Sequence, residues 1–253
     1  MTALEPARRG PLGLALAVPL RHDRPMASNP IRPALFRFLE ELAAHNDRVG
    51  FQDNKQRYRD EVRDPLLHFI ADFAPRLKKV SRHMEADPRP VGGSLFRIHR
   101  DTRFAKDKRP YKTHAGITFR HVQGRDVHGP IFYLHLEPGN VFAASGIWMP
   151  PSDTLGRIRD AIVEAPAAWR KVSRAIALDG GHGDDDGKLK RAPRGYDPEH
   201  PHVEDLKRKS FTSSASFDER KACAPGFAVA LAQQYAAARP LMKFLTQAVA
   251  LPF

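Results

Sequence analysis

Apolar residues in the N-terminal third of the chain recur at the spacing of an α-helix. The first group follows Pro33 and occupies one helical face: Leu35, Phe38, Leu39 and Leu42. A second run advances in steps of 4, 4, 3, 4, 4, 3 and 4 residues: Tyr58, Val62, Leu66, Phe69, Phe73, Leu77, Val80 and Met84. Pro65 and Pro75 lie inside this run, and proline removes a backbone donor. We therefore expect a long helix with kinks or breaks.

Between residues 95 and 148 the apolar positions change to a period of two. Four segments show this pattern or a dense apolar run: Phe96 with Ile98, Ile117 with Phe119, 131–136 and 141–148. Stretches rich in proline and glycine separate them. Short strands with turns between them predict an antiparallel sheet.

Helical spacing returns at residue 155 and continues to residue 176, and we expect Pro166 to divide this stretch. One more alternating segment, 211–217, predicts a strand, and one or two helices parted at Pro240 close the chain. Strands that cluster rather than alternate with helices favour the α+β class. The expected fold is a central, mainly antiparallel sheet flanked by N-terminal and C-terminal helices.

The chain shows no internal repeat and no linker that would divide its core, so we expect a single α+β domain over residues 29–253. Residues 1–28 differ in pattern from the rest. Their apolar run of about ten residues is too short to cross a membrane, and no small-residue cleavage pattern follows it. We expect a disordered or mis-annotated extension, with Met26 as a plausible start, and a flexible loop at 180–187.

Composition narrows the class of protein. Of 253 residues, 42% are hydrophobic, which argues against a disordered chain, a coiled coil or a polytopic membrane protein. The single cysteine, Cys223, excludes an internal disulfide framework and a Cys-rich zinc module. The formal charge of +12 favours polyanionic partners, although it can also serve solubility alone. These features are typical of a basic, soluble, cytoplasmic protein with no membrane partner.

The densest group of charges lies in residues 97–113, whose sequence is RIHRDTRFAKDKRPYKT. Seven cations accompany Asp101 and Asp107: Arg97, Arg100, Arg103, Lys106, Lys108, Arg109 and Lys112. Cations at this density can converge on one phosphate or carboxylate, and the aromatic side chains between them can stack on a base. The alternative is that the arginines and aspartates pair internally and fasten a long loop to the sheet.

A second basic segment spans residues 188–209 and includes Lys190 and Arg194. If it folds over the first segment, the two form one positive cleft; otherwise it is a solvated surface loop. Near the N-terminus, His45-Asn46-Asp47-Arg48 either caps the following helix or forms one wall of that cleft.

No metal site is predicted from the sequence. His99 with His114, and His200 with His202, lack the i, i+4 spacing of a zinc protease helix. His182 with the aspartates that follow it lacks the spacing of a calcium loop.

Several strings together resemble a known family. They include RDTRFAKDKRPYKT at 100–113, YLHLEPG at 133–139 and LKRAPRGY at 189–196. From about Pro33 to the C-terminus the chain resembles the bacterial and fungal conserved hypothetical proteins called the domain of unknown function 2461 family. The family carries a Trp-Phe pair where this chain has Gly50-Phe51. The resemblance implies a single cytoplasmic domain. It implies no activity, cofactor or substrate, because none is established for the family.

Our leading hypothesis is a small anionic ligand in a basic cleft. The candidate ligand-binding residues are Arg97, Arg100, Arg103, Lys106, Lys108, Tyr111, Lys112, Lys190 and Arg194. Asp101 and Asp107 would orient the cations, and Asp101 or His99 is the candidate general base if the protein is an enzyme. Two alternatives stay open: a nucleic-acid-binding module, and a structural or scaffold protein without a ligand. The sequence does not indicate a cofactor or an oligomeric state.

Overall fold

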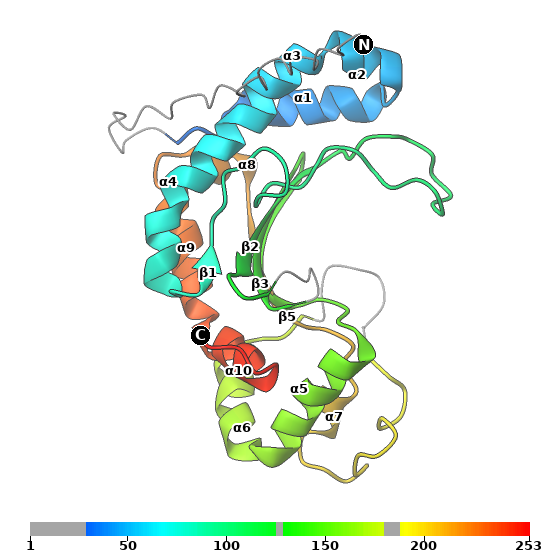
Figure 1. Ribbon diagram of the computed structural model, residues 1–253, viewed down its shortest axis with the longest axis vertical. Helices are drawn as coiled ribbons and strands as arrows, with labels where there is room; N and C mark the ends of the chain where they lie inside the picture. The colour runs from blue at the N-terminus through cyan, green and yellow to red at the C-terminus, as the bar shows by residue number, and fades with distance from the viewer. Residues whose placement is uncertain (1–28, 125–128, 180–187) are drawn as a thin grey trace, which may run out of the picture.

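A five-stranded antiparallel sheet forms the centre of the protein (Figure 1). The computed structural model describes residues 29–124, 129–179 and 188–253, so the predicted extension at 1–28 and the loop at 180–187 lie outside the described residues. The strands are adjacent in chain order: β1 (Met84–Glu85), β2 (Ala115–His121), β3 (Ile131–Glu137), β4 (Asn140–Ile147) and β5 (Phe211–Phe217). The predicted α+β class is confirmed.

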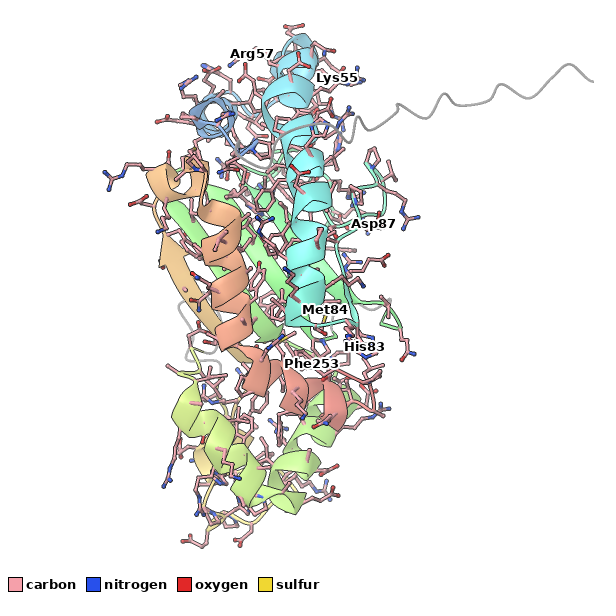
Figure 2. All side chains as sticks on the ribbon, turned by 90° about the vertical axis from the view of Figure 1, so that its left-hand side faces the viewer. Lys55, Arg57, His83, Met84, Asp87 and Phe253 are labelled. Carbon is pink, nitrogen blue, oxygen red and sulfur yellow. The ribbon has the colours of Figure 1, made fainter. Side chains whose placement is uncertain are left out.

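Helices cover one face of this sheet. Figures 1 and 2 show α4 (Asp64–Val80) and α9 (Phe227–Ala237) lying against it, and α1 (Pro33–Ala44) lies near its upper end. Strand residues alternate between the two faces. Ile117, Leu134 and Ala143 are paired across three strands and belong to the main hydrophobic core. The opposite face, which we call the open face, carries the residues between them and is covered by none of the described helices.

The long apolar run after Tyr58 forms two consecutive helical segments. Residues Tyr58–Arg63 form a π-helical turn, which follows α2 (Arg48–Asp53) and α3 (Lys55–Arg57), and α4 begins directly afterwards. Pro65 is the second residue of α4, directly after the π-helical turn, so the missing backbone donor coincides with the change of helical pattern. The expected break at Pro75 is not seen, because α4 continues through it. Burial of the apolar stripe on both sides of Pro75 offsets the lost hydrogen bond. Met84, predicted as the end of this helix, lies in β1.

A second hydrophobic cluster lies at the other end of the sheet. It joins α5 (Ser152–Glu164), α6 (Pro166–Ala175), α7 (Val203–Leu206) and α10 (Arg239–Ala248) around the fully buried Trp169. The Trp169 Nε1–H donates to Asp205 at 2.7 Å, so the one polar atom of this indole is satisfied. The predicted division at Pro166 is confirmed, and the C-terminal helices are parted close to Pro240. A short helix, α8 (Glu219–Cys223), precedes α9.

The alternation of Phe96 and Ile98 does not produce a regular strand. Residues 94–96 touch the edge of β2 through an isolated bridge between Leu95 and Ile117, and the Phe96 N–H donates to the Gly116 carbonyl at 2.9 Å. The chain then leaves the sheet and forms a long loop that returns at Ala115 (Figure 1). None of the helices described by the structure has the length and apolar character required to cross a bilayer.

Candidate functional site

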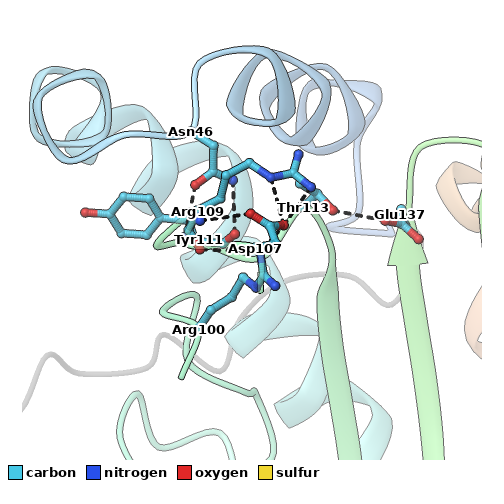
Figure 3. A network of polar contacts seen from close by, with 7 residues as sticks. All are labelled: Asn46, Arg100, Asp107, Arg109, Tyr111, Thr113 and Glu137. Carbon is cyan, nitrogen blue, oxygen red and sulfur yellow. Dashed lines mark hydrogen bonds and ion pairs between the residues drawn. The ribbon is translucent and has the colours of Figure 1, made fainter. Parts of the chain in front are cut away.

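The arm, defined here as residues 97–112, is fastened to the N-terminal helices through Asn46 and Phe51. The Asn46 side chain forms two hydrogen bonds with the backbone of Tyr111: its Oδ1 accepts from the N–H and its Nδ2 donates to the carbonyl, both at 3.0 Å (Figure 3). The Tyr111 ring stacks on Phe51 with centroids 4.1 Å apart. Asp47 caps α2 by accepting from the Gly50 N–H at 2.9 Å, so the predicted capping role belongs to Asp47.

Most arginines of the arm are paired with its own aspartates. Asp107 contacts Arg100 at 2.6 Å and Arg109 at 2.8 Å (Figure 3), and Asp101 contacts Arg103 at 2.7 Å. The hydrogen bond from Arg103 is the main cause that lowers the pKa of Asp101 to about 2. Arg109 likewise lowers the pKa of Asp107. For Arg100 and Arg103, these contacts agree with the alternative in which the arginines and aspartates of the arm pair with one another.

The other predicted arm residues have different surroundings. Lys108 donates to the Thr102 carbonyl at 3.1 Å, whereas Arg97 and Lys106 are exposed and form no ion pair with a described residue. Tyr111 is 3% exposed, and its ring contacts Phe51 and the exposed His99. Its ring face is therefore already occupied. Asp101, one candidate general base, is a weak base because its pKa is low.

The second basic segment lies far from the arm. Figure 1 shows the arm near the upper end of the long axis and residues 188–209 near the lower end, beside α5. Lys190 and Arg194 are exposed there. Tyr196 holds this segment to α5, since its hydroxyl donates to Asp160 at 2.8 Å. The structure therefore does not bring the two basic segments into one cleft.

A group of partly buried polar side chains lies instead on the open face, at the base of the arm. We call it the open-face cluster, and it consists of Lys112, His114, Tyr133, His135 and Glu137. The last three occupy alternate positions of β3 and therefore share one face. His114 directly precedes β2.

Hydrogen bonds join the β3 members of the cluster into a chain. The Tyr133 hydroxyl lies 3.0 Å from His135 Nδ1, and His135 Nε2 lies 3.1 Å from Glu137 Oε2. Glu137 also accepts from Thr113 at 3.1 Å, shown in Figure 3, and from Asn140 at 3.2 Å. These contacts fix the orientation of the imidazole and the carboxylate.

Rings hold His135 from both sides. Its imidazole lies 4.5 Å from the His114 ring and is stacked on Phe142, at 4.7 Å between centroids. Tyr133 leans across β2 at Gly116, where a Cβ would lie 2.7 Å from the tyrosine hydroxyl. The absence of a side chain at Gly116 therefore makes room for Tyr133.

Three members of the cluster, His114, Glu137 and Tyr133, have pKa values that depart from their ordinary values. Burial, followed by the proximity of His135, lowers the pKa of His114 to about 4, so this imidazole is neutral at pH 7. Burial raises the pKa of Glu137, but the hydrogen bonds from His135, Asn140 and Thr113 outweigh it and leave a lowered pKa. Burial also raises the pKa of Tyr133. Grouped perturbations of this kind are typical of functional sites.

The open-face cluster and its edge carry positive charge that has no carboxylate partner among the described residues. Lys112 is half-buried and forms no ion pair with a described residue; burial and then Arg97 lower its pKa. Its ammonium lies 5.0 Å from the centre of the Phe96 ring, and the Arg120 guanidinium lies 5.8 Å from the same ring. On the same face, the buried Thr118 hydroxyl lacks a hydrogen-bond partner among the described residues.

His135 and Glu137 were not predicted as site residues from the sequence. They are hidden inside a dense apolar run, and His114 was paired with His99 rather than with them. The available signal was the alternation of polar side chains in Y-x-H-x-E at 133–137, because residues at i, i+2 and i+4 of a strand share a face.

A separate concave surface, which we call the basic cleft, lies where the C-terminal end of α4 meets the start of α10. Its volume is about 870 Å³, and no aspartate or glutamate side chain lines it. Five cations do: Lys78, Lys79, Arg82, Arg239 and Lys243. Arg239 also donates to the carbonyls of Lys79 and Val80 and thereby caps the end of α4.

Most of the chain matches one protein family. Residues 34–244 match the family described as conserved hypothetical protein (DUF2461). The chain belongs to this family. The arm, the open-face cluster and most of the basic cleft lie inside the matched region of the DUF2461 protein. No curated protein and no solved structure matched the chain in the corresponding comparisons.

Proposed function

We propose that this DUF2461 protein binds a small ligand bearing a phosphate or carboxylate on the open face of its sheet. The observation that carries the proposal is the half-buried ammonium of Lys112, which has no ion-pair partner among the described residues. A buried charge is costly unless it is paired. An anion bound beside Lys112 would supply the missing partner.

Neighbouring groups support the same ligand chemistry. Arg97 and Arg120 add positive charge close to Lys112, and neither forms an ion pair with a described residue. Within the arm, Arg100 and Arg103 are neutralised by aspartates, and we assign them a structural role.

A thermal-shift screen with inorganic phosphate, phosphosugars, nucleotides and small carboxylates tests the proposal. A charged hydrogen bond contributes about 1.5–3 kcal/mol, so we expect Lys112→Gln to weaken binding about 10- to 100-fold. Lys106→Gln is the matched control, because Lys106 is exposed and also unpaired among the described residues. No response to any compound, or equal loss in both variants, would reject the proposal.

A second candidate function, nucleic-acid binding, is favoured by the basic cleft alone. Its five cations and the lack of a lining acidic side chain suit a polyphosphate backbone. Binding there would weaken steeply with salt, and the double variant Lys79→Gln/Lys243→Gln would reduce the salt slope by about 2. Absent or salt-insensitive binding to single- and double-stranded RNA and DNA would reject this candidate. Failure of both tests would leave the scaffold hypothesis.

We also propose that the protein is cytoplasmic. The single cysteine of the chain offers no internal disulfide of the kind used by exported proteins.

A further inference from the structure

Three potential metal ligands converge within the open-face cluster. One ligand atom each from His114, His135 and Glu137 lies within 4.8 Å of the other two. Ala115 is paired with Leu136 in the β2–β3 register, which places His114 beside Glu137 on the adjacent strand. Two imidazoles and one carboxylate are thus held by two neighbouring strands rather than by a loop.

We propose that His114, His135 and Glu137 bind a divalent transition-metal ion, with Zn²⁺ as the representative ion. The proposal shares the open-face cluster with the proposed function but does not require an anionic ligand to bind there. Donor atoms of a zinc site lie about 2.0–2.2 Å from the ion. The 3.1 Å separation of His135 Nε2 and Glu137 Oε2 is compatible with one ion held between them.

The surroundings of the three side chains match those of metal ligands. A ligating histidine usually bonds its second ring nitrogen to another group. Here the Tyr133 hydroxyl contacts Nδ1 of His135, so Nε2 can bind the ion in place of its present hydrogen bond to Glu137. The Glu137 carboxylate is oriented by Thr113 on one oxygen and by Asn140 on the other.

The donor set also selects the class of ion. Two imidazole nitrogens and one carboxylate suit Zn²⁺ or Fe²⁺, whereas Ca²⁺ and Mg²⁺ prefer a shell of oxygens. Three protein ligands leave at least one coordination position free, as in catalytic rather than structural zinc sites.

The charge of the ligand set points to the nature of a further ligand. Of the three proposed ligands, Glu137 alone is a carboxylate, so a bound dication would keep one positive charge. An anionic group in the free coordination position would therefore be favoured.

The contrasting interpretation is that Glu137, His135 and Tyr133 form only a hydrogen-bond chain that stiffens the sheet. Direct metal binding by the full chain distinguishes the two. Protein freed of metal with a chelator and then desalted is titrated with Zn²⁺ in a calorimeter, and Co²⁺ binding is followed by visible absorption. We expect one ion per chain and a Co²⁺ spectrum typical of low coordination number, without the sulfur charge-transfer band that ligation by Cys223 would give.

Variants locate the ion. Tyr133→Phe should weaken Zn²⁺ binding about 10- to 100-fold, the usual effect of removing a group that orients a ligand. His114→Gln and Glu137→Gln should weaken it further. His68→Gln and Glu40→Gln are matched controls, because both residues are exposed on helices, and they should bind like the unchanged protein. Circular dichroism checks that each variant is folded.

The proposal is overturned if the unchanged protein binds no Zn²⁺ at micromolar concentration, or if folded His114→Gln and Glu137→Gln bind as well as the controls. Zinc binding that persists while every anion fails would reject the proposed function and leave the metal site. Anion binding by protein that takes up no Zn²⁺ would reject the metal site and leave the proposed function.

Discussion

The side chain of Asn46 pairs with the backbone of Tyr111 as a neighbouring strand would, giving one hydrogen bond and receiving another at 3.0 Å. The two residues are 65 positions apart in the chain. Through this pair the N-terminal helices hold the base of the arm, and the arm in turn leads directly into Lys112 and His114. The position of the open-face cluster therefore depends on a contact outside the sheet.

Replacement of Asn46 should loosen this attachment. Asn46→Ala leaves a partly buried N–H and carbonyl of Tyr111 unpaired, which costs about 1–3 kcal/mol of the free energy of unfolding. Urea denaturation measures the loss. Asn46→Asp retains the acceptor for the N–H but places a carboxylate oxygen against the Tyr111 carbonyl, so it should also destabilise the protein. Equal stabilities for all three proteins would contradict a structural role for this pair.

Two glycines should respond oppositely to alanine. Gly50 lies in α2, and a Cβ there meets its nearest neighbour at 3.6 Å, an ordinary contact. Gly50→Ala should raise stability by about 0.5–1 kcal/mol because glycine is unfavourable in a helix. Gly116→Ala should lower it, since the new methyl would meet the Tyr133 hydroxyl at 2.7 Å and Phe96 at 2.9 Å. Melting temperatures test both, and a stabilised Gly116→Ala would show that Tyr133 moves away easily.

The buried hydroxyl of Thr118 should reduce the stability of the fold. It lacks a partner among the described residues, so Thr118→Val should leave the free energy of unfolding unchanged or raise it by about 1 kcal/mol. The same change should not alter the binding of any anion identified by the screen, because the hydroxyl is shielded from the surface. Thr246→Val is the contrasting control, because that buried hydroxyl donates within α10 and has no place on the open face. Loss of stability in Thr118→Val would mean that its hydroxyl contributes to the fold.

Alkaline pH should destabilise the protein through its tyrosines. Burial raises the pKa of Tyr58 to about 12; burial, followed by the bond to Asp160, does the same for Tyr196. In the unfolded chain these phenols ionise near pH 10. The folded state thus binds more protons above pH 10, so its stability should fall as the pH rises from about 10 to about 12. Urea denaturation across this range, with absorbance at 295 nm as the measure of ionisation, tests the prediction.

The Tyr196→Phe variant gives the corresponding control. It removes one of the shifted groups, so its stability should depend less steeply on pH in the same window. A slope equal to that of the unchanged protein would show that Tyr196 ionises normally in the folded state.

The ion pairs of the arm should control its order rather than global stability. Asp107 accepts from Arg100 and Arg109, and both pairs are partly exposed, where ion pairs contribute little to folding. Asp107→Asn should therefore leave the melting temperature nearly unchanged while trypsin cuts the arm faster. Asp153→Asn, an exposed change on α5, is the control. An unchanged cleavage rate would show that these pairs do not order the arm.

Local pattern predicted the elements of this fold better than its site. Periodicity located β2 to β5 and most helices, because each buries one face against a core. Asn46 gave no signal for its bond to Tyr111, since a contact across 65 residues leaves no trace in spacing. The arm has many cations, and the sequence alone could not show that Asp101 and Asp107 neutralise several of them. His135 and Glu137 were obscured by the apolar residues between them, which face the core.

The β3–β4 hairpin restricts how this surface can diversify. Glu137 is paired with Asn140 across a two-residue turn in which Gly139 has a positive φ of 72°. Insertion or deletion of one residue in β3 would turn Tyr133 and His135 inward and expose Phe132 and Leu134 to solvent. Related chains can thus change the open-face cluster by substituting single side chains. A change in the length of β3 would also disrupt the hydrophobic core.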